Sequence, residues 1–274
     1  MSTSISIMSL IELADLTPEN IRKIWKLAQA QSNPSPGNVA WSFEGNGIRT
    51  RTTFISAFRA LGLAYTELPN FLKTTERPED LAGYLDAFYD IYVIRESNHA
   101  RLKEFASYSR RPVVNAMSAE GHPCEVLSDA GYIDSVLMPL EKCHICLYGP
   151  PTNVFNSWHE LARQLGITIS HVCPPAFHSE SLNVRFTDIP PSNVDIVITD
   201  GWPSHHESAI SLSLEALACM GKPRLLPTPP FSIGRELAFD PLTYPGFTGY
   251  AQKEWLLRVQ TAILSFLLGR CARD

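Results

Sequence analysis

The sequence predicts an α/β protein with two doubly wound parallel-sheet domains and an interdomain cleft. The chain has 274 residues, 45% of them hydrophobic, which is enough material for two cores. Short apolar runs alternate with segments of helical period, and this β-α-β series occurs twice. We expect a first domain over residues 1–130, a second over residues 131–250, and a final segment, residues 251–274, whose helix packs back on the first domain.

The expected elements follow from local patterns along the chain. A first helix is expected after Thr17-Pro18-Glu19, which supplies an N-cap, a first-turn proline and an acidic residue in that order. A second helix should carry Phe54, Ala57, Phe58 and Leu61 on one face, and later helices are expected over Asn156–Leu165, Leu212–Met220 and Trp255–Leu268. The predicted strands are Val39–Phe43, Leu63–Leu68, Ile91–Ile94, Pro112–Asn115, His144–Tyr148, Ile167–Val172, Val194–Thr199 and Arg224–Pro227.

Composition argues against several functional classes. The formal net charge is −5, so no broad basic surface favours nucleic acid, and no segment is apolar enough to predict a membrane span. Of the six cysteines only Cys143 and Cys146 are close in sequence, and no second pair completes a zinc set. We therefore expect a reduced, cytoplasmic protein with no metal and no cofactor.

An anion site is predicted around Gly47–Arg51, which follows a strand and opens a helix. A helix N-terminus offers unpaired N–H groups, Arg49 adds a planar fork suited to phosphate, and Thr50 adds a hydroxyl. An ordinary N-cap loop with surface arginines remains the alternative.

Other polar groups follow strands in the same way. Arg95 ends the run Ile91–Ile94, and His122-Pro123-Cys124-Glu125 follows the fourth strand, so both should face the same cleft. Asp200 closes a strongly apolar strand in the second half, where a carboxylate suits a cationic amine. A surface charge, a structural histidine and a helix cap are the respective alternatives.

Taken in order, these stretches resemble the aspartate/ornithine carbamoyltransferase family. Phe43–Arg51 matches the family pattern Phe-x-x-x-Ser-Thr-Arg-Thr-Arg, Arg95 matches the strand-end arginine, and His122–Glu125 matches His-Pro-x-Gln. Gly149–Asn153 is similar to Gly-x-x-x-Asn, and Asp200–Ser204 to the ornithine-type Asp-x-Trp-x-Ser-Met-Gly. The resemblance covers nearly the whole chain and implies transfer of a carbamoyl group from carbamoyl phosphate to an amine.

The resemblance also implies roles. Carbamoyl phosphate would be held in the first domain by Gly47, Ile48, Arg49, Thr50, Arg95, His122 and Glu125. Thr50, Arg95 and His122 would be catalytic, because they would point at the carbonyl oxygen and stabilise its developing negative charge. The amino-acid-like acceptor would be held in the second domain by Asn153, Asp200, Ser204, His205, Pro227 and Thr228.

The chain also departs from the family pattern. Gly47-Ile48 replaces Ser-Thr, and one lost hydrogen bond to a charged group costs roughly 1.5–3 kcal/mol, or about tenfold to a hundredfold in affinity. Glu125 replaces glutamine and would repel a nearby phosphate dianion. His205-His206 replaces Met-Gly and either lines the acceptor pocket or is a solvated loop pair, while the stretch from Ser204 to Leu226 is much shorter than in the family. These changes favour an altered acceptor and a specialised biosynthetic pathway.

Two alternatives stay open. Besides the carbamoyltransferase, the chain could be a relative that has lost transfer and binds only an anionic ligand or a partner protein, or an enzyme that uses another donor. By resemblance we also expect a homotrimer, in which Arg77 reaches a neighbour's site.

Overall fold

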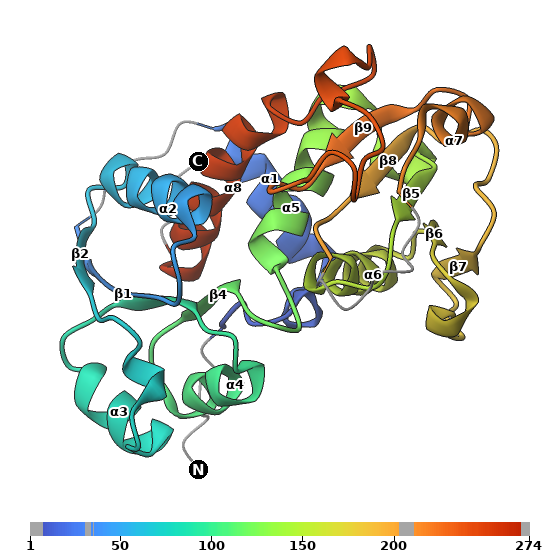
Figure 1. Cartoon of the computed structure of the whole chain (residues 1–274). Helices are drawn as coiled ribbons and strands as arrows, with labels where there is room; N and C mark the ends of the chain where they lie inside the picture. Colours follow the sequence, from blue (N-terminus) through green and yellow to red (C-terminus); the bar gives the residue numbers. More distant parts are fainter. Residues whose placement is uncertain (1–7, 31–33, 35, 203–210, 270–274) are drawn as a thin grey trace. The chain divides into compact units, whose positions relative to one another are not determined.

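The computed structural model describes residues 8–30, 34, 36–202 and 211–269. The chain forms two compact units: unit 1 comprises Met1–Gly131 and Glu254–Asp274, and unit 2 comprises Tyr132–Lys253. Each unit contains one sheet of parallel strands with helices, which confirms the predicted α/β class of two parallel sheets (Figure 1). Among the described residues, no helix has the length and apolar character needed to cross a membrane.

The sheet of unit 1 has four strands in the order β2-β1-β3-β4. Their bounds are β1 Asn38–Phe43, β2 Ala64–Glu67, β3 Ile91–Arg95 and β4 Val113–Met117. The helices of this unit are α1 Pro18–Gln29, α2 Ile48–Ala60, α3 Pro78–Leu85, α4 His99–Tyr108, α5 Pro123–Tyr132 and α8 Ala251–Leu267, the last counted from Glu254.

Helices cover both faces of this sheet. Trp41 of β1 contacts the rings of Phe54 and Phe58 from α2. The neighbouring residue Ala40, on the opposite face, lies in a core cluster with Tyr92 of β3, together with residues of α3 and α4. The central strands are therefore buried on both sides, as a parallel sheet requires, and their apolar runs are continuous.

The sheet of unit 2 has five strands in the order β7-β6-β5-β8-β9. Their bounds are β5 Ile145–Tyr148, β6 Ile169–Val172, β7 Val184–Thr187, β8 Ile196–Thr199 and β9 Arg224–Pro227, and the helices of this unit are α6 Asn153–Leu165 and α7 Leu214–Cys219. Phe155 of α6 packs on His171 of β6, whereas Leu217 of α7 belongs to a cluster with Cys146 of β5, so the two helices cover opposite faces. Short helical turns lie at Leu13–Asp15, Phe71–Lys73, Ile133–Leu137, Leu140–Lys142, Pro175–Phe177 and Pro241–Thr243.

Most predicted elements are present with small shifts at their ends. The Thr17 side chain caps α1 by accepting from the N–H of Asn20, as the sequence predicts. Strand β7 was not predicted. It lies at the edge of its sheet, and of its four residues only Val184 is buried, so it lacks the apolar run that marks the buried strands.

Candidate active site

Both sheets contain a point where the strand order reverses. In unit 1 this point lies between β1 and β3, and in unit 2 between β5 and β8. The connections after these strands leave in opposite directions, and in open α/β sheets ligands bind at the carboxyl ends of the strands beside such a point. The predicted site residues follow these four strands or their neighbours β4 and β9.

The first residues of α2 are packed against the end of β3. Gly47 is the N-cap of α2 and has a positive φ of 26°. A Cβ at this position would lie 2.0 Å from the ring of Phe43 and 3.0 Å from Nη1 of Arg95. Gly47 therefore does more than remove a hydroxyl, because a side chain here would collide with the Phe43 ring, over which Arg95 lies.

Phe43 forms a platform for two guanidinium groups. The guanidinium carbon of Arg95 lies 5.2 Å from the centre of the Phe43 ring, and that of Arg51 lies 4.8 Å away. Arg51 is also paired with Glu67, at 2.6 Å between Nη1 and Oε1. Its charge is thereby compensated, in contrast to that of Arg95.

Two cations at this edge are not compensated. Among the residues that the structure describes, the guanidinium groups of Arg49 and Arg95 have neither an ion-pair nor a hydrogen-bond partner. Burial lowers the pKa of Arg95, nearby Glu44 raises it, and the charge of Arg49 lowers it further. Two positive charges therefore lie near each other, beside the N–H groups that begin α2, in an arrangement suited to an anion.

The remaining predicted residues of unit 1 come from α2 and α5. Thr50 is buried in the first turn of α2. His122 is buried immediately before α5, and Glu125 is buried in the first turn of that helix. Strand β4 lies next to β3 and parallel to it. The connection that carries His122 therefore leaves the sheet at the same carboxyl end as Arg95. Burial and the Glu125 charge raise the pKa of the Cys124 thiol, which disfavours the reactive thiolate.

The corresponding edge of unit 2 carries carboxyl and hydroxyl groups. Asn153 begins α6, and Asp200 is buried directly after β8. Pro227 ends β9, and the backbone N–H of Thr228 donates to the carbonyl of Thr199 at 2.8 Å. The hydroxyls of Thr199 and Thr228 are buried and have no hydrogen-bond partner within the described part of the chain. The predicted residues Ser204 and His205 lie outside the described residues.

One buried acidic residue at this edge was missed from the sequence. Glu236 is 3% exposed, and its Oε2 accepts from the N–H of Ser232 at 2.7 Å. Its Oε1 lies 3.7 Å from the position of a Cβ built on Gly201, next to Asp200. Arg235 stands 3.8 Å from that oxygen and donates to the carbonyl of Trp202 at 2.6 Å. Glu236 lies outside the helices and strands, where no periodicity marks it.

Two buried histidines support the connection after β5. Nε2 of His171 donates to the carbonyl of Gly149 at 2.8 Å. The neutral ring must then accept at Nδ1, so His159 donates from its Nε2, at 3.1 Å. Gly149 has a φ of +134°, and a Cβ there would lie 2.9 Å from the ring of Trp202. The histidine pair therefore holds in place a backbone turn that packs on the Trp202 segment.

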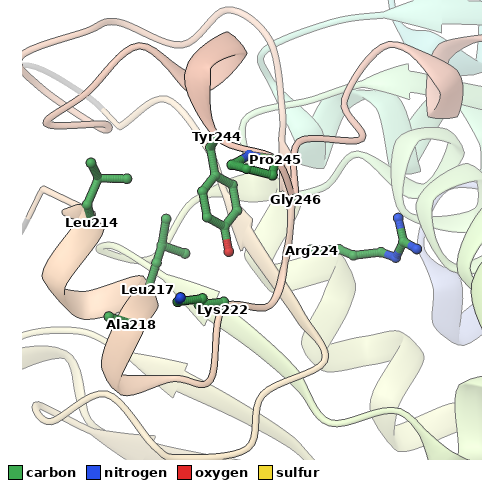
Figure 2. Close-up of a pocket in the computed structure, with 8 residues that line it drawn as sticks. All are labelled: Leu214, Leu217, Ala218, Lys222, Arg224, Tyr244, Pro245 and Gly246. Carbon is green, nitrogen blue, oxygen red and sulfur yellow. The ribbon is translucent and has the colours of Figure 1, made fainter.

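A cavity in unit 2 lies away from these residues. Its volume is about 580 Å³, and it is lined by Leu214, Leu217, Ala218, Lys222, Arg224, Tyr244, Pro245 and Gly246. Arg224 begins β9, at the opposite end of that strand from Thr228. Figure 2 shows its side chain directed away from the other lining residues. The cavity therefore does not belong to the predicted site.

Comparisons with known proteins bear on the identity of this fold. Residues 8–135 match the family model described as aspartate/ornithine carbamoyltransferase, carbamoyl-P binding domain. The ornithine carbamoyltransferase of Rhizobium johnstonii is 26% identical, over 94% of this chain and 97% of that protein. That of Caulobacter vibrioides is 29% identical, over 72% of this chain and 69% of that protein.

The solved structures agree with this result at the level of fold. The crystal structure of ornithine carbamoyltransferase from Burkholderia thailandensis E264 has a TM-score of 0.87 at 23% identity, and covers 96% of this chain and 99% of that one. The chain therefore shares the fold of that structure, with two parallel sheets and their covering helices. Residues 8–135 therefore resemble the carbamoyl-P binding domain of the aspartate/ornithine carbamoyltransferases, and the relatives given above are named ornithine carbamoyltransferases.

Proposed function

We propose that this protein transfers the carbamoyl group of carbamoyl phosphate to an amine of an amino-acid-like acceptor. Unit 1 is the donor-binding domain and unit 2 the acceptor-binding domain. The observation that carries the proposal is the pair Arg49 and Arg95, whose uncompensated charges lie beside the N-terminus of α2.

The donor's phosphate is held by Arg49, Thr50 and Arg95, together with the backbone N–H groups of Gly47 and Ile48. Their charges and dipoles favour a dianion at this position. A planar guanidinium on a rigid aromatic platform loses little freedom on binding, so the stacking of Arg95 on Phe43 supports its role.

The chemistry is orientation and charge stabilisation. The lone pair of the acceptor amine attacks the carbonyl carbon of the donor, and the bond from that carbon to the bridging phosphate oxygen breaks. Thr50, Arg95 and His122 stabilise the negative charge that develops on the carbonyl oxygen. The departing phosphate takes the amine proton, so that a ureido product and inorganic phosphate are formed. Glu125 accepts a hydrogen bond from the carbamoyl NH2 group.

The acceptor is held at the carboxyl edge of unit 2. Asp200 faces the α-ammonium and Asn153 the α-carboxylate, while the backbone carbonyls of Pro227 and Thr228 receive the reacting amine. We propose further contacts from Ser204 and His205. The buried carboxylate of Asp200 and the hydroxyl of Thr228 support a polar, cationic acceptor.

Product formation tests this function. The protein is incubated with labelled carbamoyl phosphate and a panel of α-amino acids that carry a side-chain amine. We expect a labelled ureido product, and its loss in His122→Ala and Arg95→Ala proteins that remain folded. If the donor disappears only at its spontaneous rate with every amine, the transfer proposal is wrong.

A binding function without transfer is the second candidate, and one feature favours it. Ile48, in place of a hydroxyl residue, is 66% exposed and supplies no side-chain hydrogen bond to an anion. Thermal shift separates the two candidates, because a ligand stabilises a protein by RT ln(1 + [L]/Kd). Stabilisation by inorganic phosphate that depends on Arg49, without ureido product from any amine, would indicate the binding function.

Assembly and location are the final parts of the proposal. We propose a cytoplasmic homotrimer. All the cysteines within the described residues are free thiols, which fits a reducing compartment. Exposed aromatic side chains in unit 1, including Tyr84 and Phe88 at 5.5 Å between ring centres, provide apolar surface for subunit contacts. Sedimentation of the purified protein measures the number of subunits.

A further inference from the structure

Glu44 connects the ends of three strands in unit 1. It follows β1, and its backbone N–H donates to the carbonyl of Arg95 at the end of β3, at 3.0 Å. Its Oε2 accepts from the N–H of Ser97 at 2.7 Å. Its Oε1 is paired with Nζ of Lys73 at 2.6 Å, and Lys73 lies in the connection after β2.

Lys73 contacts a second carboxylate at the same edge. Its Nζ lies 3.5 Å from Oε1 of Glu96, whose side chain is only 4% exposed. One ammonium group therefore compensates two acidic side chains near Arg95: Glu96 follows Arg95 in sequence, and the backbone N–H of Glu44 donates to the Arg95 carbonyl. The hydrogen bonds from Lys73 and Ser97 lower the pKa of Glu44 to about 2, so this carboxyl is ionised at neutral pH.

The compensation matters because Arg95 is the nearby cation without a partner. Glu44 already acts on the Arg95 charge across a short distance. If Lys73 were absent, the ionised Glu44 would attract the guanidinium and oppose the approach of any anion. Opposite charges at partly buried positions attract each other strongly enough for a carboxylate to compete with a bound anion for the guanidinium.

We propose that Lys73 is a positioning residue for the donor site: it holds Glu44 and Glu96 and thereby leaves Arg95 available to the donor's phosphate. This inference rests on the proposed function of unit 1. It assigns to Lys73 an effect on donor affinity that acts through other residues and needs no contact between Lys73 and the ligand.

The test is a double-mutant cycle with inorganic phosphate as the probe, measured by calorimetry and thermal shift. Lys73→Met should weaken phosphate binding by about tenfold, roughly the effect of one uncompensated charge at a partly exposed site. Glu44→Gln, which keeps an acceptor for Ser97, should leave binding unchanged or slightly stronger. The double variant should recover most of the lost affinity.

The matched control is Lys103→Met. Lys103 is paired with Glu12 at 2.8 Å in unit 1 and has a similar exposure to that of Lys73, so it reports the loss of an ordinary surface ion pair. In steady-state assays Lys73→Met should raise the KM for carbamoyl phosphate and leave the KM for the acceptor unchanged. The effect should shrink at high salt.

The measurements distinguish a wrong role for Lys73 from a wrong donor site. Equal affinity in Lys73→Met and wild-type protein would overturn the inference, as would a double variant as weak as Lys73→Met, which would show that the lysine acts as a structural tie or a direct ligand. If Arg95→Ala also binds phosphate normally, the proposed donor site itself is wrong. If Arg95→Ala loses phosphate while Lys73→Met does not, only the role of Lys73 is rejected.

Discussion

The two units present the same topological feature with opposite charge. In unit 1 the carboxyl ends of the strands carry Arg49 and Arg95, whose guanidinium groups have no ion-pair or hydrogen-bond partner among the described residues, and the nearby Glu44 is held by Lys73. In unit 2 the corresponding edge carries the buried carboxylates of Asp200 and Glu236. The same strand topology therefore presents cationic side chains in one unit and acidic side chains in the other, as the proposed donor and acceptor roles require.

The supporting groups differ in the same way. Unit 1 positions its edge with ion pairs that involve exposed side chains, such as Lys73 with Glu44. Unit 2 positions its edge with a hydrogen bond from the fully buried ring of His171 to Gly149. The carboxylates of ion pairs and neutral imidazoles titrate in different pH ranges. Acidification should therefore destabilise one unit before the other.

The largest expected effect is a loss of stability on acidification that begins in unit 2. Burial lowers the pKa of His159 to about 3 and that of His171 to about 4, from an ordinary value of 6.5. Between pH 6.5 and about 4 the unfolded chain binds protons that the folded chain does not, so stability falls with pH by up to about 1.4 kcal/mol per pH unit for each ring. The contribution of Glu44 is present above pH 4.5 and is lost only as pH falls toward about 2.

Hydrogen exchange and urea unfolding between pH 7 and pH 4 measure this difference. The strands of unit 2 should lose protection before those of unit 1. His159→Phe should reduce the slope, because one ring then no longer titrates. Simultaneous loss of protection in both units would contradict the prediction that the buried histidines of unit 2 make that unit the first to lose stability in acid.

The next effect concerns the proposed anion site around Arg95 in unit 1. Arg95→Ala should lower kcat/KM for carbamoyl phosphate by about a hundredfold, because it removes charge-assisted hydrogen bonds from both the bound donor and the developing oxyanion. Arg59→Ala is the control, since Arg59 lies in the last turn of α2, at the opposite end of that helix from Arg49. Similar kinetics for the two variants would remove Arg95 from the site.

A smaller effect is expected at the glycine beneath Arg95. Gly47→Ala should destabilise the protein by about 2 kcal/mol and weaken phosphate binding, because its Cβ would displace Phe43 and with it the guanidinium. Gly45→Ala introduces a similar backbone strain, at a φ of +70°, but nothing lies within 4 Å of the added atom. Gly45→Ala should therefore cost stability without loss of phosphate affinity, as urea unfolding and calorimetry can verify.

The smallest effect lies at the acceptor edge. Thr228→Val should stabilise the free protein by about 1 kcal/mol, because it removes a buried hydroxyl without a partner in the described structure. It should also raise the KM for the acceptor if the Thr228 hydroxyl forms a hydrogen bond with the bound acceptor. Thr248→Val is the control and should destabilise, since the Thr248 hydroxyl donates to the carbonyl of Leu225. A destabilised Thr228→Val protein with normal kinetics would refute this role.

Much of the fold follows from local sequence. The buried strands of both sheets are found from their apolar runs, and α1 from its Thr17 cap, because these signals lie within a few residues. Strand β7 escapes prediction because its four residues form no continuous apolar run and only Val184 is buried. The position of Arg95 at a strand end is likewise visible in the sequence.

The site is less completely encoded by local pattern. The ion pair between Glu44 and Lys73 joins residues 29 positions apart, and the hydrogen bond from Ser97 to Glu44 spans 53 positions. Glu236 approaches Gly201 from an irregular segment, and the collision that excludes a side chain at Gly47 involves Arg95 from another strand. None of these contacts has a periodicity or spacing that marks it along the chain.

The sequence by itself determined the α/β class, the repeated β-α-β series and the family motifs, because propensity, burial pattern and motif spacing act over short distances along the backbone. Only the tertiary structure decided which charges are compensated and which remain open to a ligand. That outcome depends on strand order, which brings the ends of β1, β2 and β3 together and so determines that Lys73 meets Glu44 while Arg95 meets none of the described carboxylates.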